Sequence, residues 1–307
     1  MHKQIPAIFK DDLKQQQFEL DGYVQFTLLD DTEIDQLKTL YKHYFPKPSA
    51  NFYSSSFEHN YKLKKNISDE LSTILNKKFN LVFKNYDLIG AAFLSKGNGE
   101  RSEMPMHQDW TIVDESKHMA LNVWVPLQDT DEKNGTLEII RGSHLWSEGY
   151  RAPSIPFNYT GLENELKYLL STLPAKAGEI IVLNQALIHY SKPNQFETTR
   201  IAITAGIKTA NAPLLFYYWD KQKPDVVEEY LQEKDFLIRF DDFHKDIFQR
   251  PKYAQLVKTK PFEFPDSKRK DVYPLLKKAK DQDTKGKQFN LLAFIQNKLQ
   301  SLLTTQK

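Results

Sequence analysis

Residues Gly178–Ile203 read GEIIVLNQALIHYSKPNQFETTRIAI, and this stretch holds the strongest clue to the fold. Its apolar run EIIVLN, and the run RIAITAGIK that begins at Arg200 and continues to Lys208, are rich in β-branched residues and predict two short strands. His189 lies between the two runs, and Arg200 is the first residue of the second one. If the two strands are antiparallel neighbours, Arg200 lies near His189 on the same sheet. The stretch therefore predicts a polar site built on a β scaffold.

Short apolar runs of this kind recur over residues 86–208. The runs DLIGAAFLSK, HMALNVWVPL and TLEIIRG are again short, apolar and bounded by turn residues such as Asn134-Gly135, which is typical of a hairpin turn. Many short strands without regular intervening helices predict a sandwich or a barrel.

Helical patterns flank this β region. Residues 10–45 look helical at both ends around a short strand near Gly22, and residues 66–82 predict another helix. After about residue 225, VVEEYLQEKDFLIRF is helical in pattern, and basic connectors follow. We therefore expect a single domain over residues 1–307. It would have a helical part over 1–85, a β core over 86–210 and a helical, basic elaboration over 211–307.

Composition excludes several classes of function. The chain has no cysteine, so thiolate zinc sites, iron–sulfur clusters and disulfides are excluded. The formal charge of +2 indicates no nucleic-acid partner. No stretch is apolar enough for a membrane span, and the first residues lack the apolar core of a signal peptide. We expect a cytoplasmic protein.

The stretch MPMHQDW, residues 104–110, offers two candidate metal ligands. In a strand, residues i and i+2 point to the same side, so His107 and Asp109 would present an imidazole and a carboxylate together. His189 would complete the set from another strand. Two His and one carboxylate leave three positions open on a six-coordinate metal, the arrangement suited to non-haem Fe(II). The same spacing at His244 and Asp246 lies in a charged, helical pattern, and we interpret that pair as structural or solvated.

Arg200 is the candidate anion-binding residue. Its guanidinium could pair bidentately with the far carboxylate of a five-carbon diacid chelated to the metal. A structural ion pair is the alternative interpretation.

Taken together, these segments resemble the phytanoyl-CoA dioxygenase family of Fe(II)/2-oxoglutarate-dependent oxygenases. The matching pieces, in family order, are FLSKGNGERSEMPMHQDW, NVWVPLQDTDEKNGTLEIIRGSH and GEIIVLNQALIHYSKPNQFETTRIAI. The resemblance implies a mainly β, α+β fold with a double-stranded β-helix core, which is a jelly-roll or cupin-like barrel. It implies His107, Asp109 and His189 as iron ligands, Arg200 and Ser191 on the 2-oxoglutarate carboxylate, and Trp124 lining the co-substrate pocket.

The resemblance further implies a hydroxylase that uses Fe(II), 2-oxoglutarate and O₂ and acts on a small-molecule or carrier-linked substrate. Three alternatives stay open: the same site used for desaturation, epimerisation or cyclisation; a catalytically silent binding module on the same fold; and a cupin-like protein with another divalent metal. The helical stripe Phe289, Leu292, Ile295, Leu299 and Leu302 predicts a helix that packs on the domain or on a second subunit in a homodimer.

Overall fold

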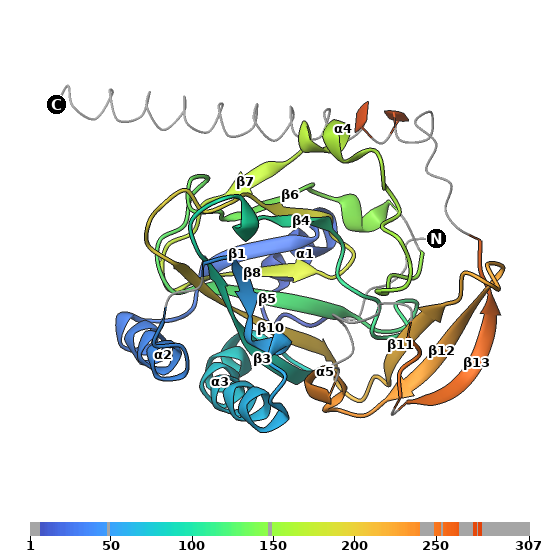
Figure 1. Ribbon diagram of the computed structural model, residues 1–307, viewed down its shortest axis with the longest axis horizontal. Helices are drawn as coiled ribbons and strands as arrows, with labels where there is room; N and C mark the ends of the chain where they lie inside the picture. Colours follow the sequence, from blue (N-terminus) through green and yellow to red (C-terminus); the bar gives the residue numbers. More distant parts are fainter. Residues whose placement is uncertain are drawn as a thin grey trace.

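The computed structural model describes residues 7–47, 50–146, 149–239, 249–252 and 254–263, together with 273–274 and 276–277. The pair His244 and Asp246 and the C-terminal stripe at 289–302 lie outside the described residues. Within them, two β-sheets face one another and helices cover the outer face of the larger sheet (Figure 1).

The N-terminal part folds as helix, strand and helix. Helix α1 (Asp12–Asp21) is capped by Asp11 and ends at Gly22, whose φ of 79° suits the left-handed C-cap that glycine adopts most easily. Strand β1 (Tyr23–Thr27) follows, and α2 (Asp31–Tyr44) starts with a reciprocal capping box between Asp30 and Glu33. Helix α3 (Tyr61–Val82) begins five residues before the helix expected at 66–82.

The larger sheet has six strands in the order β1-β8-β5-β10-β3-β2. The others are β2 (Phe52–Ser54), β3 (Tyr86–Lys96), β5 (Ala120–Pro126), β8 (Glu179–Asn184) and β10 (Arg200–Thr209). All neighbours are antiparallel. Side chains alternate along β5: Leu121, Val123 and Val125 enter the core beneath the helices, whereas Trp124 packs toward the smaller sheet. The strands expected from the sequence at 87–96, 179–184 and 200–208 are confirmed.

The smaller sheet has four short strands in the order β4-β9-β6-β7. They are β4 (Met104–His107), β6 (Leu137–Ile139), β7 (Ser171–Leu173) and β9 (His189–Ser191). Asn134-Gly135 lies between β5 and β6, which belong to different sheets, so the turn expected to close a hairpin instead carries the chain from one sheet to the other. Two facing antiparallel sheets of this kind form a jelly-roll core, and the expected fold class is confirmed.

Short helices complete the described core. They are the 3₁₀ helices η1 (Ser55–Phe57), η2 (Glu100–Ser102) and η3 (Ser143–Leu145) and the short helix α4 (Glu163–Lys167). None of the described helices is long and apolar enough to cross a membrane.

The segment after β10 corrects the helical expectation. Residues expected to be helical form β12 (Val226–Gln232), which pairs with β11 (Leu214–Trp219) and β13 (Gln255–Pro261) in a separate three-stranded antiparallel sheet. Between β12 and β13, the short α5 (Phe236–Arg239) is helical. The sequence of β12 does not show the alternation of apolar and polar residues that is typical of a half-buried strand, because the buried residue Glu229 is charged. Tyr217 donates a 2.9 Å hydrogen bond to it, and Lys260 forms an ion pair with it.

Candidate active site

Three of the side chains selected from the sequence converge between the two sheets. His107 ends β4, His189 begins β9, and Asp109 lies two residues beyond β4. Their candidate ligand atoms all lie within 4.8 Å of one another. His107 Nε2 is 3.9 Å from Asp109 Oδ1, and the two imidazole centroids are 4.2 Å apart. Two nitrogens and one carboxylate oxygen at this spacing can occupy one face of a metal ion.

Backbone carbonyls fix the tautomer of both histidines. Nδ1 of His107 lies 2.7 Å from the carbonyl of Pro105, and Nδ1 of His189 lies 2.9 Å from that of Leu187. A carbonyl oxygen only accepts, so each Nδ1 must carry a hydrogen, and in the neutral ring Nε2 then keeps its lone pair for a metal. Burial, and then the neighbouring His189, lower the pKa of His107 to about 4, so this imidazole is neutral near pH 7.

Asp109 reaches the site by a route that differs from the expected one. Strand β4 ends at His107, so alternation along a strand does not align the two side chains as expected. The chain instead leaves the strand at Gln108, whose Nε2 donates to the carbonyl of Ala186 at 2.5 Å. Asn122 on β5 then donates to Asp109 Oδ2 at 3.1 Å, while Thr204 on β10 donates to Asn122 Oδ1 at 2.5 Å. The larger sheet therefore holds the carboxylate.

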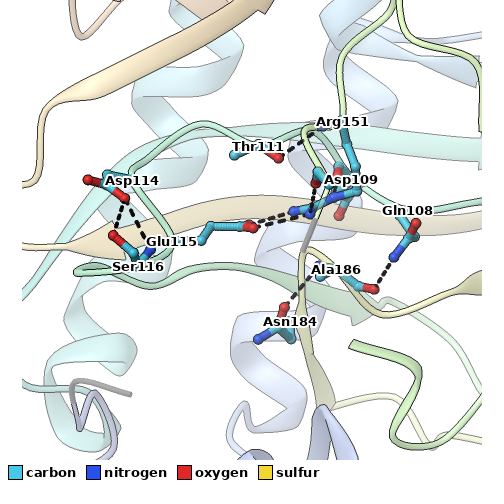
Figure 2. A network of polar contacts seen from close by, with 10 residues as sticks. Gln108, Asp109, Thr111, Asp114, Glu115, Ser116, Arg151, Asn184 and Ala186 are labelled. Atoms are coloured by element: carbon cyan, nitrogen blue, oxygen red, sulfur yellow. Dashed lines mark hydrogen bonds and ion pairs between the residues drawn. The ribbon is translucent and has the colours of Figure 1, made fainter. Parts of the chain in front are cut away.

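A buried arginine fixes the backbone of the same residue (Figure 2). Nε of Arg151 donates to the carbonyl of Asp109 at 2.8 Å, and its two terminal nitrogens contact the Glu115 carboxylate at 3.1 and 2.5 Å. Thr111 and Arg151 also exchange hydrogen bonds through their backbones and the Thr111 hydroxyl. Arg151 thus ties the loop after β4 to a segment about forty residues away.

The two histidines and Arg200 are on different sheets. His107 pairs directly with His189 across β4 and β9, as a register partner in the smaller sheet. Arg200 begins β10 in the larger sheet, between β3 and β5. The expected pairing of the His189 strand with the Arg200 strand is therefore wrong: the cation faces the histidines from the opposite sheet.

Arg200 is buried and only partly satisfied. Its side chain is 2% exposed, Nη2 donates to the carbonyl of Gly135 at 3.1 Å, and its Cζ lies 5.3 Å from the ring centre of Trp124. Nε and Nη1 are buried and have no hydrogen-bond partner. Burial lowers the pKa of Arg200 to about 9, so the guanidinium remains charged near pH 7. A buried cation with two unpartnered nitrogens fits an anionic ligand such as a carboxylate, which accepts hydrogen bonds and balances the charge.

The other two residues selected for the co-substrate pocket lie beside Arg200. Trp124 is 3% exposed and lines the cavity. Ser191 is also buried, but its hydroxyl donates to the carbonyl of Gly135 at 2.7 Å, the same oxygen that accepts from Arg200. The Ser191 hydroxyl therefore holds the loop at Gly135 that also contacts Arg200. Direct donation by Ser191 to the carboxylate of a co-substrate stays a prediction.

One cavity of about 400 Å³ connects these groups. Its floor consists of residues that pair directly across β3 and β10: Lys96 with Arg200 at one end, Ala92 with Thr204 in the middle, and Gly90 with Gly206 at the other end. Six residues of strand separate the ends, which corresponds to roughly 20 Å. Asp109, held by the Asn122–Thr204 pair, lies over the middle. The cavity therefore has a cationic arm and a glycine-floored arm, with the candidate metal ligands between them.

Sequence reasoning missed three residues of this site. Asn122 could have been found, because it shares a face of NVWVPL with Trp124 by strand alternation. Arg151 and Lys96 carry no local signal, since their partners are distant in the chain: Asp109 for Arg151, and the carbonyls of Ser191 and Lys192 for Lys96.

Comparison with known proteins gives the family. The sequence model described as "Phytanoyl-CoA dioxygenase (PhyH)" matches residues 63–202, which include all three candidate ligands and Arg200. Residues 63–202 of the chain belong to the phytanoyl-CoA dioxygenase family. The match with "Phytanoyl-CoA dioxygenase domain-containing protein 1 homolog" of Dictyostelium discoideum is 28% identical over 134 residues, 41% of this chain and 48% of that protein. "Dioxygenase olcK" of Penicillium canescens is 28% identical over 42% of this chain and 41% of its own length. The chain thus spans about half the length of the curated relatives it matches.

A solved structure shares the fold of this phytanoyl-CoA dioxygenase family member. The non-heme alpha ketoglutarate dependent carbocyclase SnoK from nogalamycin biosynthesis aligns with a TM-score of 0.50 at 14% identity, over 66% of this chain and 86% of that one. Members of the family use Fe(II), 2-oxoglutarate and O₂, and the donor set here fits them. Two imidazoles and a carboxylate suit Fe(II), and the unsatisfied Arg200 suits the far carboxylate of 2-oxoglutarate.

Proposed function

We propose that this protein is an Fe(II)/2-oxoglutarate-dependent dioxygenase that hydroxylates an aliphatic C–H bond of a small-molecule or carrier-linked substrate. In this proposal His107, Asp109 and His189 hold the iron, and Arg200 binds the co-substrate with Trp124 and Ser191 beside it. One observation carries the proposal. A charged, buried guanidinium with two unpartnered nitrogens lies at one end of the cavity that also contains the three candidate ligands.

When bound together, Fe(II), 2-oxoglutarate and O₂ supply the oxidation of an unactivated C–H bond, with release of succinate and CO₂. The residues of the chain perform the other tasks. His107 and His189 present their Nε2 lone pairs because both Nδ1 atoms are held by carbonyls. Asn122 and Arg151 hold Asp109 by its side chain and its backbone. Arg200 orients the co-substrate, and the burial of Trp124 beside it keeps water from that carboxylate.

The glycine-floored arm is the proposed substrate site. Gly90 and Gly206 leave the floor there without side chains, and apolar walls come from Trp110, Ile112 and Ile238. Glycines inside a strand are typical of places where a ligand approaches the backbone closely. These features support a partly apolar substrate that lies beside the metal, on the side opposite to Arg200.

Other outcomes of the same chemistry are the alternative. Desaturation, epimerisation or cyclisation would need the same ligands and Arg200, and the fold is shared with a carbocyclase. The intact set of three candidate ligands together with Arg200 argues against a catalytically silent binding module on this fold. A protein with another divalent metal and no co-substrate would leave Arg200 without a function.

Substrate-free turnover tests the proposal. We expect the wild-type protein to form succinate from 2-oxoglutarate in the presence of Fe(II) and O₂, and Arg200→Ala to lose this activity. Arg101→Ala, a change at an exposed arginine, serves as the control and should leave it unchanged. A screen of metabolite extracts for products heavier by one oxygen then separates hydroxylation from the alternatives. The absence of succinate under all conditions would overturn the proposed function.

A further inference from the structure

Lys96 is a second buried basic residue beside Arg200. It is the last residue of β3 and the direct register partner of Arg200 on β10, so the two side chains leave neighbouring strands on the same face. Lys96 is 0% exposed, and both residues line the same arm of the cavity.

The Lys96 amine spans the space between the sheets. Nζ donates to the carbonyls of Ser191 at 2.8 Å and Lys192 at 2.6 Å, at the end of β9. Gly135 makes room for this contact: a Cβ there would lie 3.3 Å from Nζ and 2.3 Å from the Lys192 carbonyl. A neutral amine has two hydrogens, and both are used by these carbonyls. A protonated amine has a third N–H that needs another acceptor.

No carboxylate pairs directly with either basic side chain in the part of the chain that the structure describes. Neither Lys96 nor Arg200 forms an ion pair there, although both are buried. The nearest acidic groups have other partners: Glu138 accepts from Thr172 and pairs with Lys192, and Glu103 accepts from Tyr190. Adjacent buried charges of one sign are costly unless an anion joins them. The cationic arm therefore suits an anionic ligand that interacts with Lys96 as well as with the Arg200 guanidinium.

We propose that Lys96 and Arg200 form a paired-cation site for the far carboxylate of the co-substrate, in which Lys96 becomes fully charged only when that carboxylate is bound. This inference rests on the proposed function. Lys96 acts as a positioning residue: it ties β3 to the end of β9 and adds the second positive charge to the arm.

The electrostatics of the arm couple co-substrate binding to a proton. Burial, and then Arg200, lower the pKa of Lys96 to about 6, while Glu103 and Glu138 oppose the shift weakly. Lys192, the other cation at this end, is paired with Glu132 and Glu138. Without a ligand, Lys96 is therefore mostly neutral above pH 6. An incoming carboxylate favours the charged form and raises this pKa, so binding takes up a proton and weakens as the pH rises.

Calorimetry on the wild-type protein loaded with Mn(II) tests this without any variant. Titrations with 2-oxoglutarate in two buffers of different ionisation enthalpy, at pH 7.5, give the number of protons taken up. We expect most of one proton per 2-oxoglutarate and none with 2-oxobutyrate, which chelates a metal in the same way but lacks the far carboxylate. The Kd for 2-oxoglutarate should rise by up to about tenfold per pH unit above pH 7.

Two variants assign the proton to Lys96. Lys96→Met should abolish the uptake specific to 2-oxoglutarate and make its Kd nearly independent of pH. Lys208→Met is the matched control, because Lys208 is equally buried on β10 but pairs with Asp87, so it should keep the wild-type uptake. Equal proton uptake for the two ligands in the wild type, or normal uptake in Lys96→Met, would overturn the inference. If the wild type does not bind 2-oxoglutarate at all, the proposed function itself fails.

Discussion

The amide of Asn122 on β5 donates a 3.1 Å hydrogen bond to Oδ2 of Asp109, which leaves Oδ1 directed at the two histidines. Thr204 on β10 donates to Oδ1 of the same amide, so the amide cannot turn without breaking both contacts. The carboxylate is thus oriented by the larger sheet, although the histidines belong to the smaller one.

Asn122→Ala should weaken metal binding. Groups that orient a metal ligand typically contribute 10- to 100-fold to affinity, so we expect the Mn(II) dissociation constant to rise on the order of tenfold or more. Titration followed by electron paramagnetic resonance measures it. Asn80→Ala, at an exposed position on α3, is the control. An unchanged Mn(II) affinity in Asn122→Ala would show that Asp109 is held by its backbone alone.

Arg151→Met should lower the stability of the metal-free protein. The change leaves the carbonyl of Asp109 without its donor and removes the ion pair with Glu115, in which Arg151 is 7% exposed and Glu115 30% exposed in their side chains. Losing the partner of a buried polar group costs about 1–3 kcal/mol in the free energy of unfolding. Urea unfolding measures it, and Arg239→Met, at an exposed ion pair, should have little effect. Equal stability of wild type and Arg151→Met would rule out this tethering role.

The ligand motif could be predicted from sequence because its context is local. HQD, His189 and Arg200 each lie at the edge of an apolar run, and alternation in β5 and β10 correctly assigns the faces of the larger sheet. The partition of strands between sheets could not be predicted, because β9 and β10 are consecutive in the chain and periodicity does not say which strands pair. For the same reason the sequence did not indicate that Lys96 belongs to the site, because the strand that its Nζ contacts lies about a hundred residues away.

The C-terminal sheet shows a different reason why the sequence pattern did not predict the structure. In VVEEYLQ the apolar residues Val226, Val227, Tyr230 and Leu231 have helical spacing, and a charged residue occupies a buried position of the strand. Tyr217 on β11 and the two lysines Lys258 and Lys260 on β13 make that burial acceptable, and all three lie outside the strand in sequence. Tertiary pairing therefore overrode the local pattern.

Asp87 and Lys208 predict a pH dependence of stability at the other end of the β3–β10 pair. The hydrogen bond from Lys208, at 2.6 Å, holds the pKa of Asp87 below its usual value. A carboxyl whose pKa is lower in the folded state stabilises the fold above its unfolded pKa of about 4, and this contribution is lost as the pH falls through the folded value. Asp87→Asn should therefore be less stable than the wild type at pH 6, with a difference that shrinks below pH 4. Urea unfolding from pH 3 to 7 measures it, and a difference independent of pH would contradict this account.

Ile238 on α5 extends the cavity beyond the segment that matches the family, because this residue lies after position 202 and lines the arm floored by Gly90 and Gly206. α5 also packs against α3, and Asp235 just before it accepts a hydrogen bond from Tyr61 at 3.3 Å. A larger side chain at 238 should therefore fill the proposed substrate arm and leave the cationic arm free.

Ile238→Trp should keep substrate-free succinate formation and the Kd for 2-oxoglutarate, yet lose the stimulation of turnover by an active metabolite extract. Leu256→Trp, at a half-exposed position on β13, is the matched control and should behave as the wild type. The measurement is succinate formed with and without the extract. If Ile238→Trp loses 2-oxoglutarate binding instead, the two arms have been assigned in the wrong order; if stimulation persists, the substrate does not occupy the glycine-floored arm.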